Sequence, residues 1–120
     1  MFRTAGTYPV IVFFPGLACT TSVAEYSTVL EHVASWGYAI IGPWAMLYNP
    51  GDTYAAEWVD LVLEWCRGNL DPASAQRPQY NIAPGVLIDF DTMYLGGQSS
   101  GNHVAINYIA LQQDQVHISS

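Results

Sequence analysis

Three short, largely hydrophobic runs stand out along this chain. The first covers residues 8–14, a nearly continuous series of β-branched and aromatic side chains that Pro15 ends. The second covers residues 38–41, and the third covers residues 92–96. Continuous apolar runs of this length are typical of parallel strands that are covered on both faces. The pattern therefore predicts three buried strands.

Each run is followed by a segment whose apolar residues recur with helical spacing. The first begins at the capping-box pair Ser22 and Glu25, and Gly37 ends it. Its predicted core-facing residues are Tyr26, Val29, Leu30 and Val33. A second helix is predicted from Asp52 or Thr53 to about residue 67, with a core-facing stripe of Tyr54, Trp58, Leu61, Val62 and Trp65. Its acidic residues are expected on the solvent side: Glu57, Asp60 and Glu64.

The remaining segments carry weaker signals. A third helix is predicted over residues 102–111, whereas residues 44–51 and 68–84 lack periodicity and are expected to be loops. Residues 86–88 predict a short apolar plug before the third strand. Asp89 and Asp91 follow it and are expected to be turn and cap residues that precede that strand.

The alternation of strands and helices predicts the fold class. It favours an α/β protein with a parallel sheet, right-handed crossovers and helices on both faces, in a three-layer α/β/α arrangement. The chain shows no internal repeat and no change in composition that would mark a second domain. Residues 1–120 are therefore expected to form a single domain.

Composition and charge exclude several functional classes. Hydrophobic residues make up 51% of the 120 residues and charged residues 11%, which indicates a globular chain. The net charge of −7, with no lysine, argues against nucleic acids or anionic membrane surfaces as partners. The longest apolar run is too short to cross a bilayer, and the N-terminus lacks the features of a signal peptide. We therefore expect no nucleic-acid partner and no integral membrane segment.

Cysteine and histidine positions give no sign of a metal site. Cys19 and Cys66 fit no metal-binding or redox motif, and the histidines share no ligand spacing with them or with one another. Cys66 lies on the apolar side of the second predicted helix, which favours a buried free thiol, although a disulfide between the two cysteines stays open. We expect neither a metal nor another cofactor.

A glycine-flanked serine lies between the third predicted strand and the third predicted helix. Gly97, Ser99 and Gly101 match G-x-S-x-G, the pattern of a nucleophile elbow. A strand that turns directly into a helix strains the backbone of the residue at the apex, and it leaves no room for side chains two positions away. The serine hydroxyl would then be exposed near a helix N-terminus, which favours a developing oxyanion. Ser99 is therefore a candidate nucleophile.

The main alternatives for this segment are a phosphate-binding loop and a plain structural turn. Gly96 and Gly101 also fit G-x-x-x-x-G, but Asn102 and His103 stand where such a loop needs Lys and then Ser or Thr. The dinucleotide pattern G-x-G-x-x-G fails because Gln98 replaces its second glycine. The strand and helix around the serine favour the elbow.

Three segments together resemble the serine ester hydrolases of the α/β-hydrolase fold, in particular the chlorophyllase, platelet-activating-factor acetylhydrolase and cutinase-like polyesterase branches. Residues 8–17 are similar to the family's strand that ends in His-Gly or Pro-Gly and supplies the oxyanion loop. Residues 32–43 resemble its passage of helix, glycine, aromatic residue, strand and proline. Residues 88–101 resemble its run of aspartate, strand and elbow. The resemblance implies a partial α/β-hydrolase fold that corresponds to the N-terminal half of the family's domain.

The resemblance also implies a mechanism, acyl transfer to Ser99. The backbone N–H groups of Leu17 and Ser100 would hold the oxyanion, and Gly16 would let its loop turn an amide inward. In that fold the strand with the oxyanion loop lies beside the elbow strand, where strand order reverses. Leu17 and Ser99 should therefore meet at the carboxyl edge of the sheet. The implied substrate is a small-molecule or lipid ester.

The sequence signals for residues of a substrate pocket are weaker than those for the nucleophile elbow. Gln98 stands where these families usually carry His, Tyr or Trp, so it would change the pocket wall. Trp44, Met46 and Tyr48 follow the second predicted strand near the same edge, where they would line a substrate subsite or serve ordinary packing.

The rest of the catalytic triad is not expected in this chain. In the family, the triad acid and histidine follow the nucleophile after later strands, which are absent here. His103 would point along the helix flank as a surface or subsite histidine, and His117 would reach Ser99 only if the tail doubled back. Asp114, like Asp89 and Asp91, is expected to be a turn or cap residue. We therefore expect an N-terminal portion of a longer hydrolase that is inactive alone. A non-catalytic binding remnant and an incomplete gene product remain the alternatives.

Overall fold

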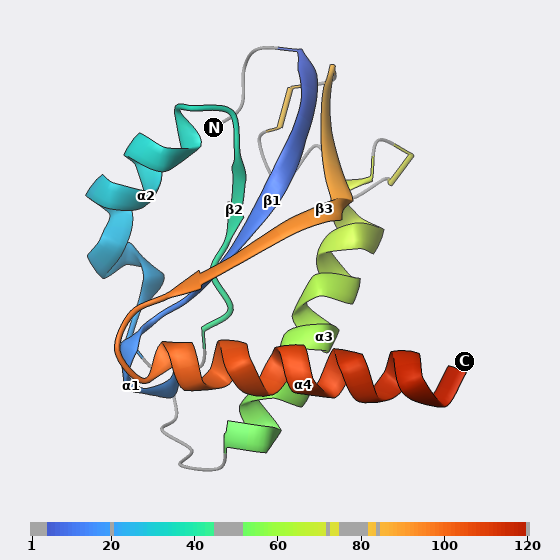
Figure 1. The fold of residues 1–120 in the computed structure, drawn as a ribbon. Helices are drawn as coiled ribbons and strands as arrows, with labels where there is room; N and C mark the ends of the chain where they lie inside the picture. The colour runs from blue at the N-terminus through green and yellow to red at the C-terminus, as the bar shows by residue number, and fades with distance from the viewer. Residues whose placement is uncertain are drawn as a thin grey trace.

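The computed structural model describes residues 5–19, 21–44, 52–71, 73–74, 82–83 and 85–119. Its elements, all but η1 labelled in Figure 1, are β1 (Gly6–Phe14), α1 (Gly16–Cys19), the 3-10 turn η1 (Val23–Tyr26), α2 (Ser27–Ala34), β2 (Ala39–Ile41), α3 (Asp52–Leu70), β3 (Val86–Gly97) and α4 (Gly101–Ser119). The described strands form a parallel sheet in the order β2-β1-β3. The predicted parallel α/β sheet is therefore confirmed.

Strand β1 lies in the middle of the described sheet although it comes first in the sequence. Val10 pairs with Ala39 of β2 on one side, and Phe14 pairs with Gly97 of β3 on the other. The chain thus adds β2 to one side of β1 and then returns to the other side to add β3. This is the reversal of strand order at which α/β sheets bind ligands.

Side chains of β1 alternate between two covered faces. Val10, Val12 and Phe14 are fully buried in a core that also contains Val59 and Leu63 of α3 and Val104 of α4. Phe13 points the other way, and its ring meets the ring of Tyr26 of η1 edge-on at 4.8 Å between centroids. In Figure 1, α4 runs across the lower part of the view and crosses α3, whereas α2 lies at the left, apart from both. The expected three layers are present.

The segment that leads into α2 differs from the prediction in detail. Ser22 acts as an N-cap, since its hydroxyl accepts the Ala24 N–H at 3.2 Å, but it caps the 3-10 turn η1 and not α2 itself. Val29 of α2 was predicted in the apolar stripe and is exposed. The 3-10 turn changes the helical phase, so a stripe counted at one period across both elements does not stay on one face.

Strand β3 is longer than predicted. The plug at residues 86–88 and the strand at residues 92–96 belong to a single strand of 12 residues. Its register with β1 shifts between Pro9, which pairs with Asp89, and Val10, which pairs with Met93. Extra residues therefore bulge from β3 at this point. The prediction that Asp89 and Asp91 precede the strand is wrong, because both lie inside β3 at the bulge.

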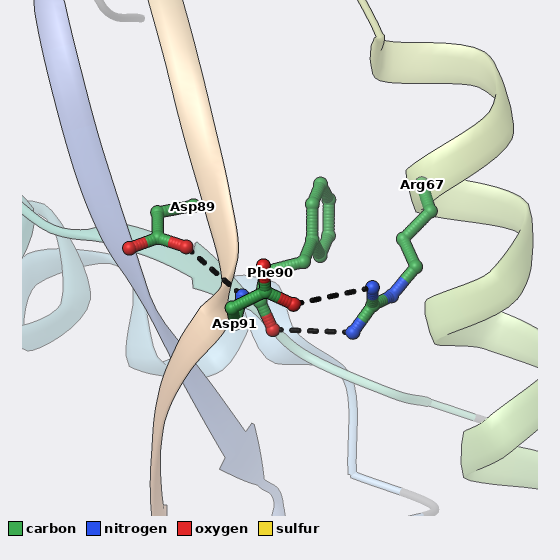
Figure 2. A network of polar contacts seen from close by, with 4 residues as sticks. All are labelled: Arg67, Asp89, Phe90 and Asp91. Atoms are coloured by element: carbon green, nitrogen blue, oxygen red, sulfur yellow. Dashed lines mark hydrogen bonds and ion pairs between the residues drawn. The ribbon is translucent and has the colours of Figure 1, made fainter.

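Polar contacts explain why β3 continues through this bulge (Figure 2). The Asp89 carboxylate accepts the Asp91 N–H at 3.0 Å, which replaces a ladder bond with a local turn. Hydrogen bonds from the Thr92 side chain and from the Asp91 N–H lower the pKa of Asp89. Arg67 of α3 donates to the Phe90 carbonyl at 3.2 Å and lies 3.8 Å from the Asp91 carboxylate. The two aspartates thus serve the bulge and lie midway along β3, away from Ser99.

Helix α3 buries a different face from the one predicted. Val59, Leu63 and Cys66 are buried, whereas Leu61 is 65% exposed and Trp65 is 50% exposed. Apolar residues surround much of this helix, so its sequence does not select the face that meets the sheet. The side chains of Tyr54 and Glu57, also part of the prediction, lie outside the described set.

Asp60 was predicted on the solvent side of α3 but lies half-buried against α4. Its carboxylate accepts the Gln112 amide at 2.9 Å. Burial, followed by the charge of Asp60 and a hydrogen bond to it, raises the pKa of Tyr108 to about 12. Asp60 is therefore a polar link between the two helices.

The two cysteines are free and buried. The expected buried free thiol at Cys66 is confirmed, and Cys19 resembles it. Burial raises the pKa of the Cys66 thiol and raises that of Cys19 to about 12. Both side chains therefore behave as small apolar groups at neutral pH.

Candidate active site

The carboxyl ends of β1 and β3 form one corner of the molecule. Phe14 and Gly97 are the last paired residues, and the Gln98 N–H donates to the Phe14 carbonyl at 3.1 Å just beyond them. The segments that follow are Pro15 and Gly16 on one side and Ser99 on the other. The backbone segments that lead into Leu17 and Ser99 therefore lie side by side. The meeting of Leu17 with Ser99 itself stays a prediction.

Ser99 lies at the point where β3 turns into α4. Its φ is 53°, the left-handed region that the strand–turn–helix spacing predicts for this position. The Gly101 N–H donates to the Gln98 carbonyl at 3.0 Å, and the Asn102 N–H donates to the Ser99 carbonyl at 3.1 Å. These turn bonds start the helix immediately and leave the serine exposed.

The glycines on either side of Ser99 are required by close backbone contacts. A Cβ added at Gly101 would lie 2.1 Å from the Phe14 carbonyl oxygen and 2.3 Å from that of Pro15. At Gly97 it would lie 2.9 Å from Asn102 Oδ1 and 3.1 Å from the Phe14 carbonyl oxygen. The neighbours at Gly101 are backbone atoms of β1 and its exit, so they cannot rotate away.

The facing loop forms the short helix α1, which the sequence reading did not predict. Leu17 is 62% exposed and has a φ of 53°, and Cys19 has a φ of 67°. Backbone bonds hold the loop in this form: the Cys19 N–H donates to the Pro15 carbonyl at 3.1 Å, and the Thr21 N–H donates to the Gly16 carbonyl at 3.2 Å. The candidate oxyanion loop thus has a defined conformation, and its Gly16 lies close to Gln98, the residue before Ser99.

A tyrosine connects the two loops. The Tyr26 hydroxyl accepts the Gly16 N–H at 3.0 Å and donates to Gln98 Oε1 at 2.9 Å. Sequence reasoning placed Tyr26 in an apolar stripe and Gln98 in a pocket wall. The two residues are 72 positions apart, so no local pattern could have paired them.

The sequence matches the chlorophyllase family over residues 1–120. The chain belongs to the chlorophyllase family. This is an α/β-hydrolase-type family, in agreement with the parallel sheet and with the resemblance of residues 8–17, 32–43 and 88–101. Chlorophyllase-1 of Arabidopsis thaliana is 39% identical over 67 residues, which are 55% of this chain and 20% of that protein. The match thus spans about a fifth of this curated relative. No solved structure matches the chain.

Within the described part of this chlorophyllase-family chain, no side chain forms a hydrogen bond with the Ser99 hydroxyl. His103 is exposed in the first turn of α4. Helix α4 continues to Ser119, so the backbone of His117 lies about 24 Å along the axis from Gly101, and the tail does not double back. The side chains of Asp114 and His117 lie outside the described set.

The other candidate pocket residues lie in different settings. Trp44 follows β2 and is 38% exposed, whereas Met46 and Tyr48 lie outside the described residues. A cavity of about 460 Å³ lies at the β3 bulge and not at the Ser99 corner. It is lined by residues that include Thr7, Arg67 and Asp91.

Two searches of the described residues bear on other chemistries. In residues 5–19, 21–44 and the later described ranges, no group of three His, Cys, Asp or Glu side chains is placed to hold a metal ion. Among the described helices, none is long and apolar enough to cross a membrane.

Proposed function

We propose that this chain carries the nucleophile and the oxyanion loop of a serine carboxylic-ester hydrolase. The observation that carries the proposal is the exposed Ser99 with a φ of 53° between a parallel strand and a helix. It lies beside the β1 corner, where strand order reverses. Membership of the chlorophyllase family supports the same chemistry.

The proposed reaction has two acyl-transfer steps. The Ser99 Oγ attacks the ester carbonyl and loses its proton to a base, and the tetrahedral intermediate then expels the alcohol, which takes up a proton. Water attacks the resulting acyl-serine, releases the carboxylic acid and restores the hydroxyl. The backbone N–H groups of Leu17 and Ser100 stabilise the oxyanion in both steps, and losing one such donor typically costs ~10²–10³ in rate.

The base and its acid partner are proposed to come from sequence outside this chain, because Chlorophyllase-1 is much longer than the segment matched here. General-base catalysis contributes ~10²–10⁴ in rate. The 120 residues alone should therefore hydrolyse an activated ester no faster than their Ser99→Ala variant. No cofactor takes part in this chemistry. The family name makes a chlorophyll ester the first substrate to assay, before small-molecule and lipid esters.

One observation favours a second candidate, a non-catalytic remnant that binds a ligand or partner. Within the described residues, no side chain forms a hydrogen bond with the Ser99 hydroxyl. An incomplete gene product without independent function would show the same feature. A hydrolase should react covalently with a serine-directed probe, whereas a binding remnant or an incomplete gene product should not.

Capture of the native product with a fluorophosphonate probe tests the proposal. We expect a labelled species well above 13.2 kDa, with the modified peptide containing Ser99. Labelling should disappear in the Ser99→Ala variant and persist in Ser35→Ala, which removes an exposed hydroxyl from the end of α2. A native product of 13.2 kDa that takes no label would contradict the hydrolase and support the remnant.

A further inference from the structure

We propose that Tyr26 is a positioning residue, which fixes the Gly16–Leu17 backbone relative to the Ser99 turn through its hydroxyl. The proposal rests on the proposed function, because it assigns Leu17 and Ser99 the roles given above. Its structural part, the coupling of the two loops, stands on contacts that are independent of that function.

The direction of each hydrogen bond follows from the groups involved. The Gly16 N–H can only donate, so the Tyr26 oxygen accepts from it at 3.0 Å. The hydroxyl proton is then available for Gln98 Oε1, which lies 2.9 Å away. The Tyr26 hydroxyl thus acts both as an acceptor and as a donor, and it holds the Gln98 amide with its oxygen toward the tyrosine. The chain of bonds runs from the residue before Leu17 to the residue before Ser99.

Packing aims the tyrosine at this position. Tyr26 is the last residue of η1, and its ring meets Phe13 edge-on at 4.8 Å, on the sheet face opposite the α3–α4 core. Phe13 precedes Phe14, whose carbonyl accepts the Gln98 N–H. The strand that supports the ring therefore also anchors the turn to which its hydroxyl is bonded.

The Gly16 backbone and the Gln98 amide are in close contact. A Cβ added at Gly16 would lie 2.6 Å from Gln98 Oε1 and 3.2 Å from the Tyr26 oxygen. Glycine at this position thus leaves room for the amide to approach the backbone. Together, Gly16, Tyr26 and Gln98 form what we call the loop clamp.

The loop on one side of the clamp has a conformation that needs support. Leu17 and Cys19 are non-glycine residues in the left-handed region, with φ values of 53° and 67°. Such conformations persist only when the surroundings hold them. Without the Tyr26 hydroxyl, the Gly16 N–H loses this partner, and the Leu17 amide is oriented less tightly toward the oxyanion. Because the oxyanion forms only in the transition state, kcat should fall while KM stays nearly unchanged.

The test is Tyr26→Phe in the native full-length product, assayed on a soluble activated ester. We expect kcat to fall about tenfold, less than for loss of a whole oxyanion donor, with KM changed less than about twofold. Affinity for a trifluoromethyl ketone, which forms a tetrahedral oxyanion on a serine, should fall by the same factor as kcat. Tyr38→Phe is the matched control, since it removes the hydroxyl of another half-buried tyrosine, whose ring contacts Tyr94.

A second variant tests whether the clamp acts as a unit. Gln98→Leu removes the other end of the hydrogen-bond chain and should lower kcat by a similar factor. In the Tyr26→Phe, Gln98→Leu double variant, kcat should fall by no more than it does in the more impaired single variant. Both changes break the same series of hydrogen bonds, so their effects should not multiply. Multiplicative losses would overturn the coupling.

Amide exchange separates this inference from the proposed function. Peptides that cover residues 15–19 should exchange faster in Tyr26→Phe than in wild type or in Tyr38→Phe. Unchanged exchange together with unchanged kcat would overturn the clamp, even if Ser99→Ala abolishes turnover. Turnover that survives Ser99→Ala would overturn the proposed function, whereas faster exchange in Tyr26→Phe would still support the coupling of the loops.

Discussion

Gly101 is the single residue on which the Ser99 turn depends most. An added Cβ would lie closer than 3 Å to the carbonyl oxygens of both Phe14 and Pro15, and these belong to the backbone where β1 ends. Flexible side chains elsewhere in the turn can move, but these carbonyls cannot move without displacing β1. The turn that exposes Ser99 therefore requires glycine, the residue without a Cβ, at position 101.

We predict that Gly101→Ala destabilises the protein by about 3 kcal/mol or more, because the clash is with backbone. Gly96→Ala is the control, since a Cβ there would meet nothing within 4 Å. That change should be neutral or slightly stabilising, because alanine loses less conformational entropy than glycine in a strand. Urea unfolding of both variants measures the difference, and equal midpoints would contradict the close approach.

At the scale of elements, the contact between α3 and α4 includes a half-buried carboxylate. Asp60 of α3 accepts a hydrogen bond from Gln112 of α4 and interacts with Tyr108 of the same helix. Polar groups at this depth lose their hydration on folding, so each needs a partner. The acidic residue that pattern analysis expected in solvent thus helps to set how the two helices pack.

We predict that Asp60→Ala lowers the free energy of unfolding by about 1–3 kcal/mol, because it leaves the Tyr108 hydroxyl and the Gln112 amide without this partner. Glu64→Ala, an exposed carboxylate on the same helix, should change stability by less than about 0.5 kcal/mol. Thermal or urea unfolding of the two variants is the measurement.

A pH titration checks the same contact. The pKa of Tyr108 is raised from 10.0 to about 12 in the folded protein, so its stabilising effect is present below pH 10 and is lost as pH rises toward 12. In Asp60→Ala, the tyrosine should ionise at lower pH, which ultraviolet absorbance detects. An unchanged titration curve would contradict the interaction with Asp60.

At the scale of the whole molecule, the described structure exposes apolar surface that a stable domain normally covers. Trp58, Leu61, Val62 and Trp65 of α3 line a shallow cavity of about 310 Å³, and Tyr94 of β3 is also exposed. In the described sheet, β3 is an edge strand. An exposed edge and an apolar patch both favour association.

We predict that the isolated 120-residue chain self-associates with rising concentration. Leu61→Glu, which places a charge in the α3 patch, should raise the monomer fraction. Trp36→Glu is the control, because Trp36 is 75% exposed on a different part of the surface, just beyond α2. Sedimentation velocity over a concentration series measures the monomer fraction. Equal association of the two variants would contradict a role for the α3 patch.

Local patterns in the sequence determined the three strands, the longer helices α2, α3 and α4, and their order. These signals each act within a few residues, so they can be recognised without knowledge of tertiary contacts. They are the β-branched run before Pro15, the N-cap at Ser22 and the glycine spacing around Ser99. The strand and helix alternation was sufficient for the parallel sheet. The candidate nucleophile and its loop partner at Leu17 were likewise found from local spacing and from the family resemblance.

Only the tertiary structure decided which surfaces meet. It selected Val59, Leu63 and Cys66 over Trp65 on a helix that is apolar around much of its circumference, and it placed Asp60 half-buried against α4. It also continued β3 through the bulge at Asp89 and Asp91, because Arg67 of a distant helix binds the freed Phe90 carbonyl. The link from Tyr26 to Gln98 arises in the same way. Contacts between residues far apart in sequence depend on packing, which leaves no periodic signal in the chain.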